Sequence, residues 1–260
     1  MRVLSDVNRP KVGEGWLADL FELRLCRDRK LGTGMIPRVA FVLVLCSLAA
    51  VVVVAAAAAG RFDRLPPQPY FPRQFAQASL MYCDPEGARS PDQARAGVRS
   101  EQLVDNLEAN WFGSHLRAAQ ERSLWQPASE LRGRTLRFLW LRSFHAPAVI
   151  RIDEPARGTY WLTATLLQGN GGYEPGRIDR RVTRRLSPEE AEAYEKAYSQ
   201  LASLPRIGCG NGADGSEWII ETRDQGRYSL LKRWTPASGT FHDLGVLLIG
   251  FTGWNPKPIY

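Results

Sequence analysis

Residues 135–142 read Thr-Leu-Arg-Phe-Leu-Trp-Leu-Arg, and this stretch decides the fold. Successive side chains of a strand point to opposite faces of a sheet, so Leu136, Phe138 and Trp140 share one face. The other two leucines of the stretch lie on the opposite face. Because both faces are apolar, the stretch predicts a strand in the middle of a sheet that is covered on both sides.

Three more segments with the composition of strands follow at a spacing of about ten residues. They are Val149–Asp153, Thr159–Gln168 and Arg177–Leu186, separated by Pro147, by Gly158 and by a glycine-rich loop at 169–176. Connections this short join strands that run in opposite directions. The four segments therefore predict an antiparallel meander.

Two further strands are expected later in the chain. Glu217–Thr222 and Arg227–Trp234 flank Arg223-Asp224-Gln225-Gly226, which places a glycine where a tight hairpin turn needs a positive φ. Near the start of the domain, Ala78–Cys83 has the pattern of a short strand that ends at a turn.

Helix signals precede and follow these strands. Ser187-Pro188-Glu189-Glu190 is a capping box with proline at the first helical position, and the apolar stripe after it predicts a helix to about Ser203. Ser90-Pro91-Asp92-Gln93 predicts a short helix in the same way. Apolar residues at helical spacing predict a helix or kinked pair from about Ser100 to Arg122, and a last helix from Phe241 to Phe251.

These elements predict an α+β fold with a mostly antiparallel sheet and packed helices, preceded by one transmembrane or signal helix. The chain is divided accordingly. Residues 1–38 are expected to be a cytoplasmic tail or an overlong leader, 39–60 the transmembrane segment or signal h-region, 61–75 a proline-rich linker, and 76–260 an extracytoplasmic α+β domain.

The segment Val39–Gly60 contains 22 consecutive residues without a charge. As a helix it would span about 33 Å, enough to cross the hydrocarbon core of a bilayer. More Lys and Arg precede it than follow it, which favours a cytoplasmic N-terminus. With a start at Met35, the same residues form a signal peptide with small-residue cleavage sites before Gly60. The sequence thus predicts either an anchor in the bacterial inner membrane with a periplasmic domain, or a cleaved periplasmic or secreted protein.

The cysteines indicate the redox compartment, and the net charge limits the classes of partner. Cys83 and Cys209 are the two cysteines of the outer domain, and such a pair predicts a disulfide in an oxidising compartment; two unrelated thiols are the alternative. Residues 61–260 carry 26 Lys and Arg against 22 Asp and Glu. A net charge of +4 does not indicate nucleic-acid binding, so no nucleic acid is expected as a partner.

Four residues are candidates for catalysis. Arg142 and His145 lie where the predicted central strand ends, and Glu217 and Glu221 share one face of a later strand. The two glutamates are separated by about 13 Å along the strand, longer than the usual spacing of a glycosidase pair. An extracytoplasmic hydrolase that uses these residues is therefore an alternative rather than the leading interpretation.

The sequence predicts neither a metal site nor a cofactor. His115, His145 and His242 are scattered, whereas metal ligands cluster at short spacing. The glycine-rich loop at 169–176 lacks the lysine and the following helix with which phosphate loops bind nucleotides. It is interpreted as a hairpin loop.

Arginines and one tryptophan are the candidates for binding. Arg180, Arg181, Arg184 and Arg185 lie close together on one predicted strand, and guanidinium groups bind carboxylates and phosphates in bidentate fashion. Trp161 follows another aromatic residue on a strand, so one of the two must face outward. The alternative is an edge strand whose charges protect it against aggregation.

The leading hypothesis is a bacterial envelope protein, single-pass or exported, whose outer domain binds a partner protein or an anionic envelope polymer. If the segment 39–60 is not cleaved, the lipid bilayer is a further partner. A hydrolase and a structural module of a secretion or cell-wall assembly are the alternatives.

Overall fold

The computed structural model describes residues 69–88, 90, 95, 97–126 and 133–260. The apolar segment 39–60, the leader before it and most of the capping box predicted at Ser90–Gln93 lie outside the described residues. None of the helices that are described is long and apolar enough to span a membrane.

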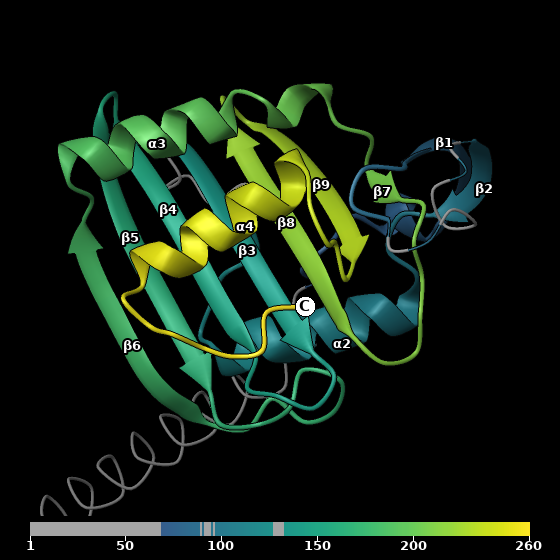
Figure 1. Ribbon diagram of the computed structural model, residues 1–260, viewed down its shortest axis with the longest axis horizontal. Coiled ribbons are helices and arrows are strands. Elements are labelled where there is room, and N and C mark those ends of the chain that lie inside the picture. Colours follow the sequence, from purple (N-terminus) through teal and green to yellow (C-terminus); the bar gives the residue numbers. More distant parts are fainter. Residues whose placement is uncertain (1–68, 89, 91–94, 96, 127–132) are drawn as a thin grey trace, which may run out of the picture. The chain divides into compact units, whose positions relative to one another are not determined.

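The described residues form an α+β fold in which one mixed sheet is flanked by helices (Figure 1). The strands are β1 (Ala78–Asp84), β2 (Val98–Gln102), β3 (Arg134–Arg142), β4 (Ala148–Ala156), β5 (Thr159–Leu167), β6 (Ile178–Arg185), β7 (Ile207–Gly208), β8 (Ser216–Asp224) and β9 (Arg227–Trp234). The helices are α2 (Asn106–Ala118), α3 (Pro188–Tyr198) and α4 (Thr240–Phe251), with 3-10 turns at Arg73–Ala76 and Leu201–Ser203.

The strand order is β2-β1-β7-β9-β8-β3-β4-β5-β6. Strands β3 to β6 form the predicted antiparallel meander, and β8 and β9 form the predicted hairpin, with positive φ at Gln225 and Gly226. Two pairings are parallel, because β7 joins β1 on one side and β9 on the other. The sheet is therefore mixed. A strand of two residues is too short to leave a pattern in the sequence, so β7 was not predicted.

The prediction of a central, doubly covered strand at residues 135–142 is confirmed. Strand β3 lies between β8 and β4, and every one of its residues after the first is buried. Phe138 and Trp140 pack with Trp218 of β8 on one face. Leu139 and Leu141 belong to the core of the opposite face.

Each face of the sheet is covered by its own helices. Figure 1 shows α3 and α4 on one face and α2 on the other. The apolar stripes of α3 and α4, represented by Tyr194, Leu244 and Leu248, pack on the first face, and Phe112 and Leu116 of α2 pack on the second. The two faces are called here the α4 face and the α2 face.

The helix predicted from Ser187 is confirmed, with a capping box formed by Ser187 and Glu190, but it ends at Tyr198 and a 3-10 turn follows. The predicted last helix is also confirmed. The helix predicted from about Ser100 starts too early, because residues 98–102 are strand β2. Helix α2 instead begins after Asp105, whose side chain and that of Glu108 form a second capping box.

A disulfide joins Cys83 at the end of β1 to Cys209, which confirms the predicted pair. The two cysteines are 126 residues apart in sequence, and their Cα atoms are 4.8 Å apart. In the chain-entropy account, a disulfide that closes a loop of this length stabilises the fold by about 5 kcal/mol. The bond is consistent with an oxidising location outside the cytoplasm.

Candidate binding groove

A groove lies on the α2 face, at the end of the sheet where β9 ends and β8 begins. It consists of two adjoining hollows of about 310 and 520 Å³ that share Leu107, Trp111 and Trp234. The smaller one contains the side chains of Glu108, Glu217 and Lys232, and the larger one contains Tyr173. We refer to the two together as the groove.

Helix α2 supplies one wall. Leu107, Trp111 and Ser114 are spaced by four and three residues, so they lie on one side of the helix and line the groove together. Leu107 is 75% exposed, and Tyr173 opposite the helix is 63% exposed. The groove thus has an open apolar mouth.

The glycine-rich loop at 169–176 supplies the second wall. The indole Nε1 of Trp111 donates a hydrogen bond to the carbonyl oxygen of Gly171 at 2.6 Å. A Cβ atom at Gly171 would come within 2.4 Å of the backbone nitrogen of Arg142, so only glycine allows the loop to lie on the end of β3. The loop is a hairpin loop between β5 and β6, as predicted, and it also fixes the position of α2.

His115 lies under this contact between the helix and the loop. Its ring is fully buried, with Nδ1 3.0 Å from the carbonyl oxygen of Trp111 and Nε2 3.5 Å from that of Asn170. Burial lowers the pKa of His115, because the charged ring would lose its hydration. A neutral His115 therefore supports the wall of the groove from beneath.

The indole ring of Trp234 forms the third side of the groove. Its position requires a glycine in the neighbouring loop. A Cβ atom at Gly212 would lie 2.4 Å from the indole Nε1 of Trp234, so the loop before β8 can approach the ring only through glycine. Trp234 also lies directly opposite Glu217 in the register of β9 and β8. The aromatic side of the groove is thus fixed by strand pairing and by a glycine contact.

Glu217 lies at the floor and is 8% exposed. Lys232, its neighbour on β9, forms its salt bridge with Glu108 of α2, and no described residue donates a hydrogen bond to the Glu217 carboxyl group. The pKa of Glu217 is raised to about 8, chiefly by burial; Glu108 and Glu101 contribute to the rise, and Lys232 and Arg233 oppose it. At neutral pH the carboxyl group is mostly protonated and can donate or accept a hydrogen bond.

The charge lining the groove is negative. Besides Glu217, the lining contains Glu101, Asp105, Glu108 and Glu174, against a single described cation, Lys232. This contrasts with the net charge of +4 on residues 61–260. An anionic ligand is therefore disfavoured here, whereas a neutral or cationic ligand is not.

The four predicted catalytic candidates are not brought together. Arg142 pairs in register with Ser216, whose hydroxyl group contacts Tyr260 on the α4 face. The next residue, Glu217, points to the α2 face, since neighbouring side chains of a strand alternate. The guanidinium group of Arg142 stacks over Trp140 and donates to the carbonyl oxygens of Ala146 and Pro258.

His145 lies beyond the end of β3 and is also separate from the glutamates. Its Nδ1 lies 2.7 Å from the hydroxyl oxygen of Tyr260, and the two rings meet edge to face. The indole Nε1 groups of Trp140 and Trp218 both donate to the carbonyl oxygen of Tyr260. Arg142 and His145 thus hold the segment at 258–260 on the α4 face.

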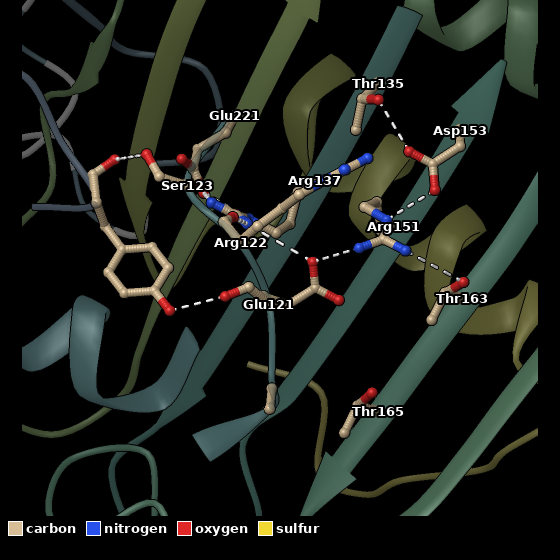
Figure 2. A network of polar contacts seen from close by, with 12 residues as sticks. Glu121, Arg122, Ser123, Thr135, Arg137, Arg151, Asp153, Thr163, Thr165 and Glu221 are labelled. Atoms are coloured by element: carbon tan, nitrogen blue, oxygen red, sulfur yellow. Dashed lines mark hydrogen bonds and ion pairs between the residues drawn. The ribbon is translucent and has the colours of Figure 1, made fainter. Parts of the chain in front are cut away.

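Glu221 belongs to a buried network rather than to the groove (Figure 2). Its carboxylate accepts hydrogen bonds from Nε of Arg137 and from the hydroxyl group of Tyr228, both at 2.8 Å. The ion pair also places Nη2 of Arg137 2.6 Å from the same carboxylate. Arg137 and Glu221 are both fully buried. Burial and the neighbouring carboxylate raise the pKa of Tyr228, so its hydroxyl group remains a donor.

The network continues across β3, β4 and the segment after α2. Arg151 forms salt bridges with Glu121 and Asp153, and Asp153 accepts a hydrogen bond from Thr135 (Figure 2). Arg137 also donates to the carbonyl oxygen of Arg122. Each buried charge has an opposite partner, so the network connects the segment at 121–123 to the sheet and leaves no free reactive group.

The predicted binding arginines lie on β6, one of the two edge strands of the described sheet, and two of them bond to other elements of the fold. Arg184 binds the Glu190 carboxylate in bidentate fashion and donates to the carbonyl oxygen of Phe251. Arg181 donates to Thr165 and to the carbonyl oxygen of Ala119. These contacts connect β6 to the helices on both faces.

Arg180 and Arg185 are both exposed. Arg180 pairs with Asp179 and lies over the ring of Trp254. Arg185 is directly opposite Trp161 in the register of β6 and β5, and Trp161 is 43% exposed. The predicted outward-facing aromatic residue of β5 is thus Trp161, which does not line the groove.

Reasoning from the sequence identified Glu217 but missed the residues around it. Trp111 falls within the predicted helix at 100–122, and Lys232 and Trp234 fall within the predicted strand Arg227–Trp234. The signals present were the tryptophan enrichment of the domain and the pattern Asp105-x-x-Glu108, which is a capping box. Within the described ranges, no three His, Cys, Asp or Glu side chains are placed to hold a metal ion.

Comparison with known proteins does not assign the chain to a family. No protein-family model, no curated protein and no solved structure matches it. The function must therefore be argued from the groove itself.

Proposed function

We propose that the chain is a bacterial envelope protein whose outer domain is a binding module, and that the groove receives its partner. The observation that carries this proposal is Glu217, a buried carboxyl group to which no described residue donates a hydrogen bond, at the floor of a groove lined by Trp111 and Trp234. Buried polar groups are ordinarily hydrogen-bonded, and an unpaired one that faces a groove supplies a contact for a ligand.

The aromatic lining supports binding in the same place. Tryptophan and tyrosine offer large apolar contact areas with few rotatable bonds, and exposed aromatic residues are enriched where proteins bind partners. Residues 39–60 would hold the domain at the bacterial inner membrane, or their cleavage would release it to the periplasm or the exterior.

An anionic polymer fits the groove poorly, because acidic side chains line it. The surface available to such a polymer is the exposed part of β6, where Arg185 lies beside Trp161. Arg181 and Arg184 contribute less there, since contacts within the fold already occupy them. A partner in the groove is therefore the better-supported form of the proposal.

A hydrolase is the second candidate, and one observation favours it. The raised pKa of Glu217, about 8, is the property of a general acid at neutral pH. Arg142 and His145 do not fit this mechanism, because Arg142 lies on the opposite face and His145 binds Tyr260. Glu108, the other carboxylate of the floor, is bonded to Lys232.

Site-specific photo-crosslinking in cells tests the binding proposal. A photoreactive amino acid in place of Leu107 lies at the mouth of the groove, and one in place of Leu80, which is 77% exposed on β1, serves as the control. We expect a discrete adduct from position 107 that Trp234→Ala abolishes. Adducts from position 80 alone, or an adduct at 107 that Trp234→Ala leaves unchanged, would contradict the proposal.

A further inference from the structure

We infer that the groove binds a basic segment of a partner protein, with a Lys or Arg side chain seated against Glu217 and an adjacent apolar side chain on Leu107 and Tyr173. This inference rests on the proposed function and specifies the chemistry of the partner. It follows from the unpaired carboxyl group, the local charge, the aromatic lining and the length of the groove.

The first argument is that no cation among the described residues forms a salt bridge with Glu217. The nearest candidate on its face, Lys232, is bound to Glu108. The other cation that influences Glu217 is Arg233, whose guanidinium group binds Asp84 and lies over Phe241 of α4, so it belongs to the opposite face. A guanidinium or ammonium group of a ligand would complete an ion pair that the fold leaves open.

The second argument is the surrounding charge. Glu101, Asp105 and Glu108 line the same half of the groove as Glu217, and Lys232 is the one cation among the described lining residues. Acidic side chains along a concave surface attract cations and repel anions, although the rest of the outer domain is basic. A neutral sugar carries no charge that these carboxylates could attract.

The third argument is the aromatic lining of the acidic half. Trp111 and Trp234 both line it, and the face of an indole ring attracts ammonium and guanidinium groups through its quadrupole. Carboxylates combined with indole rings select a cation over an uncharged chain of the same length.

The fourth argument concerns length and polarity. The lining residues of α2 extend from Leu107 to Ser114, about 10 Å along the helix. An extended peptide covers this distance with about three residues. One half of the groove contains Glu101, Asp105, Glu108 and Glu217, whereas the other half contains Tyr173 and a single acid, Glu174, and both halves share Leu107. A basic residue next to an apolar one matches this division, and a lone cation or a small amine does not use the second half.

Binding of such a segment should release a proton from Glu217. Glu217 is mostly protonated at pH 7, because burial, Glu108 and Glu101 raise its pKa against the influence of Lys232 and Arg233. A cation against the carboxyl group favours the ionised form, so binding near pH 7 releases roughly one proton.

Isothermal titration calorimetry on the full chain in detergent micelles tests the inference. The probe is the blocked tetrapeptide Gly-Lys-Leu-Gly. The matched peptide carries norleucine, an uncharged residue of similar length, instead of lysine. We expect at least tenfold weaker binding of the norleucine peptide to the wild type. We also expect at least tenfold weaker binding of the lysine peptide to Glu217→Gln.

The control variant is Glu192→Gln, which removes one exposed acid of α3 on the other side of the sheet and should leave Kd within twofold. Titrations in buffers of different ionisation enthalpy should show the released proton in the wild type and its loss in Glu217→Gln. The norleucine peptide tests the charge on an unaltered protein, so a folding defect of the variant cannot decide the result.

Each outcome is decisive. Equal binding of the two peptides would overturn the basic-segment inference. Binding of a neutral N-acetylglucosamine tetramer in place of either peptide, lost in Trp234→Ala, would overturn the inference and leave the groove as the binding site. The proposed function would also be contradicted if Trp234→Ala left the binding of both the peptide and the sugar unchanged. The same would follow if the wild type bound neither of them.

Discussion

Glu217 of β8 and Trp234 of β9 lie directly opposite each other in an antiparallel pair, and both line the groove. Strand pairing therefore places a buried acid beside an indole ring, and Gly212 lets the loop before β8 approach that ring. This arrangement makes the acid sensitive to pH and to any cation that enters the groove.

The first prediction concerns pH and the free energy of unfolding. An unfolded glutamic acid ionises near pH 4.5, whereas folded Glu217 keeps its proton up to about pH 8. Unfolding releases a proton between these values, so stability falls as the pH rises from 5 to 8, by roughly 3 to 4 kcal/mol through this group. Urea denaturation at several pH values should show a shallower slope for Glu217→Gln, while Glu192→Gln should keep the wild-type slope.

The second prediction concerns the buried pair of Arg137 and Glu221. Arg137→Met leaves the Glu221 carboxylate buried without its cation and should destabilise the fold by about 3 to 5 kcal/mol. Replacing both residues, with Glu221→Leu as the second change, should restore most of this loss because no lone charge remains. A double-mutant cycle measured by urea denaturation checks the result. Additive effects would show that the two side chains do not act as a pair.

The third prediction concerns the disulfide. Cys83→Ser combined with Cys209→Ser opens a loop of 126 residues and should lower the free energy of unfolding by about 5 kcal/mol. Intact mass after thiol alkylation, with and without a reductant, reports the bond in protein isolated from the envelope. Full alkylation of both cysteines without reductant would contradict the pairing.

The fourth prediction concerns the glycine-rich loop. Gly171→Ala places a Cβ atom 2.4 Å from the Arg142 backbone and should displace the loop, at a cost of about 1 to 3 kcal/mol. The loss of the hydrogen bond from Trp111 should weaken ligand binding in the groove too. Gly250→Ala in α4 meets no atom within 4 Å and should be neutral or slightly stabilising. Similar effects of the two changes on thermal unfolding would contradict this account.

Much of the fold was predictable because its longest strands carry strong periodic patterns. Residues 135–142 are apolar on both faces and form the central strand, and the capping box at Ser187 starts a helix where expected. Strand β2 was missed because Val98–Gln102 is polar after its first residue and half exposed. Its conformation comes from pairing with β1, about twenty residues earlier, and not from its own composition.

The groove could not be predicted from spacing. Trp111, Tyr173 and Glu217 come from elements separated by tens of residues, and they meet only because the meander and the hairpin bring these elements to one end of the sheet. A sequence shows that Glu217 is on a strand, but not that it is buried beside Trp234. The arginines of β6 stand out in the sequence as a possible binding surface. The sequence does not show that two of them are already bonded to α3 and to the segment after α2.

The bond between Cys83 and Cys209 also determines when the groove is complete. Cys209 is followed directly by residues 210–212, which form part of the rim beside Trp234. While both thiols are reduced, nothing covalent holds that rim to β1. If the domain is exported, as proposed, this covalent link between the rim and β1 forms only after the chain has left the reducing cytosol.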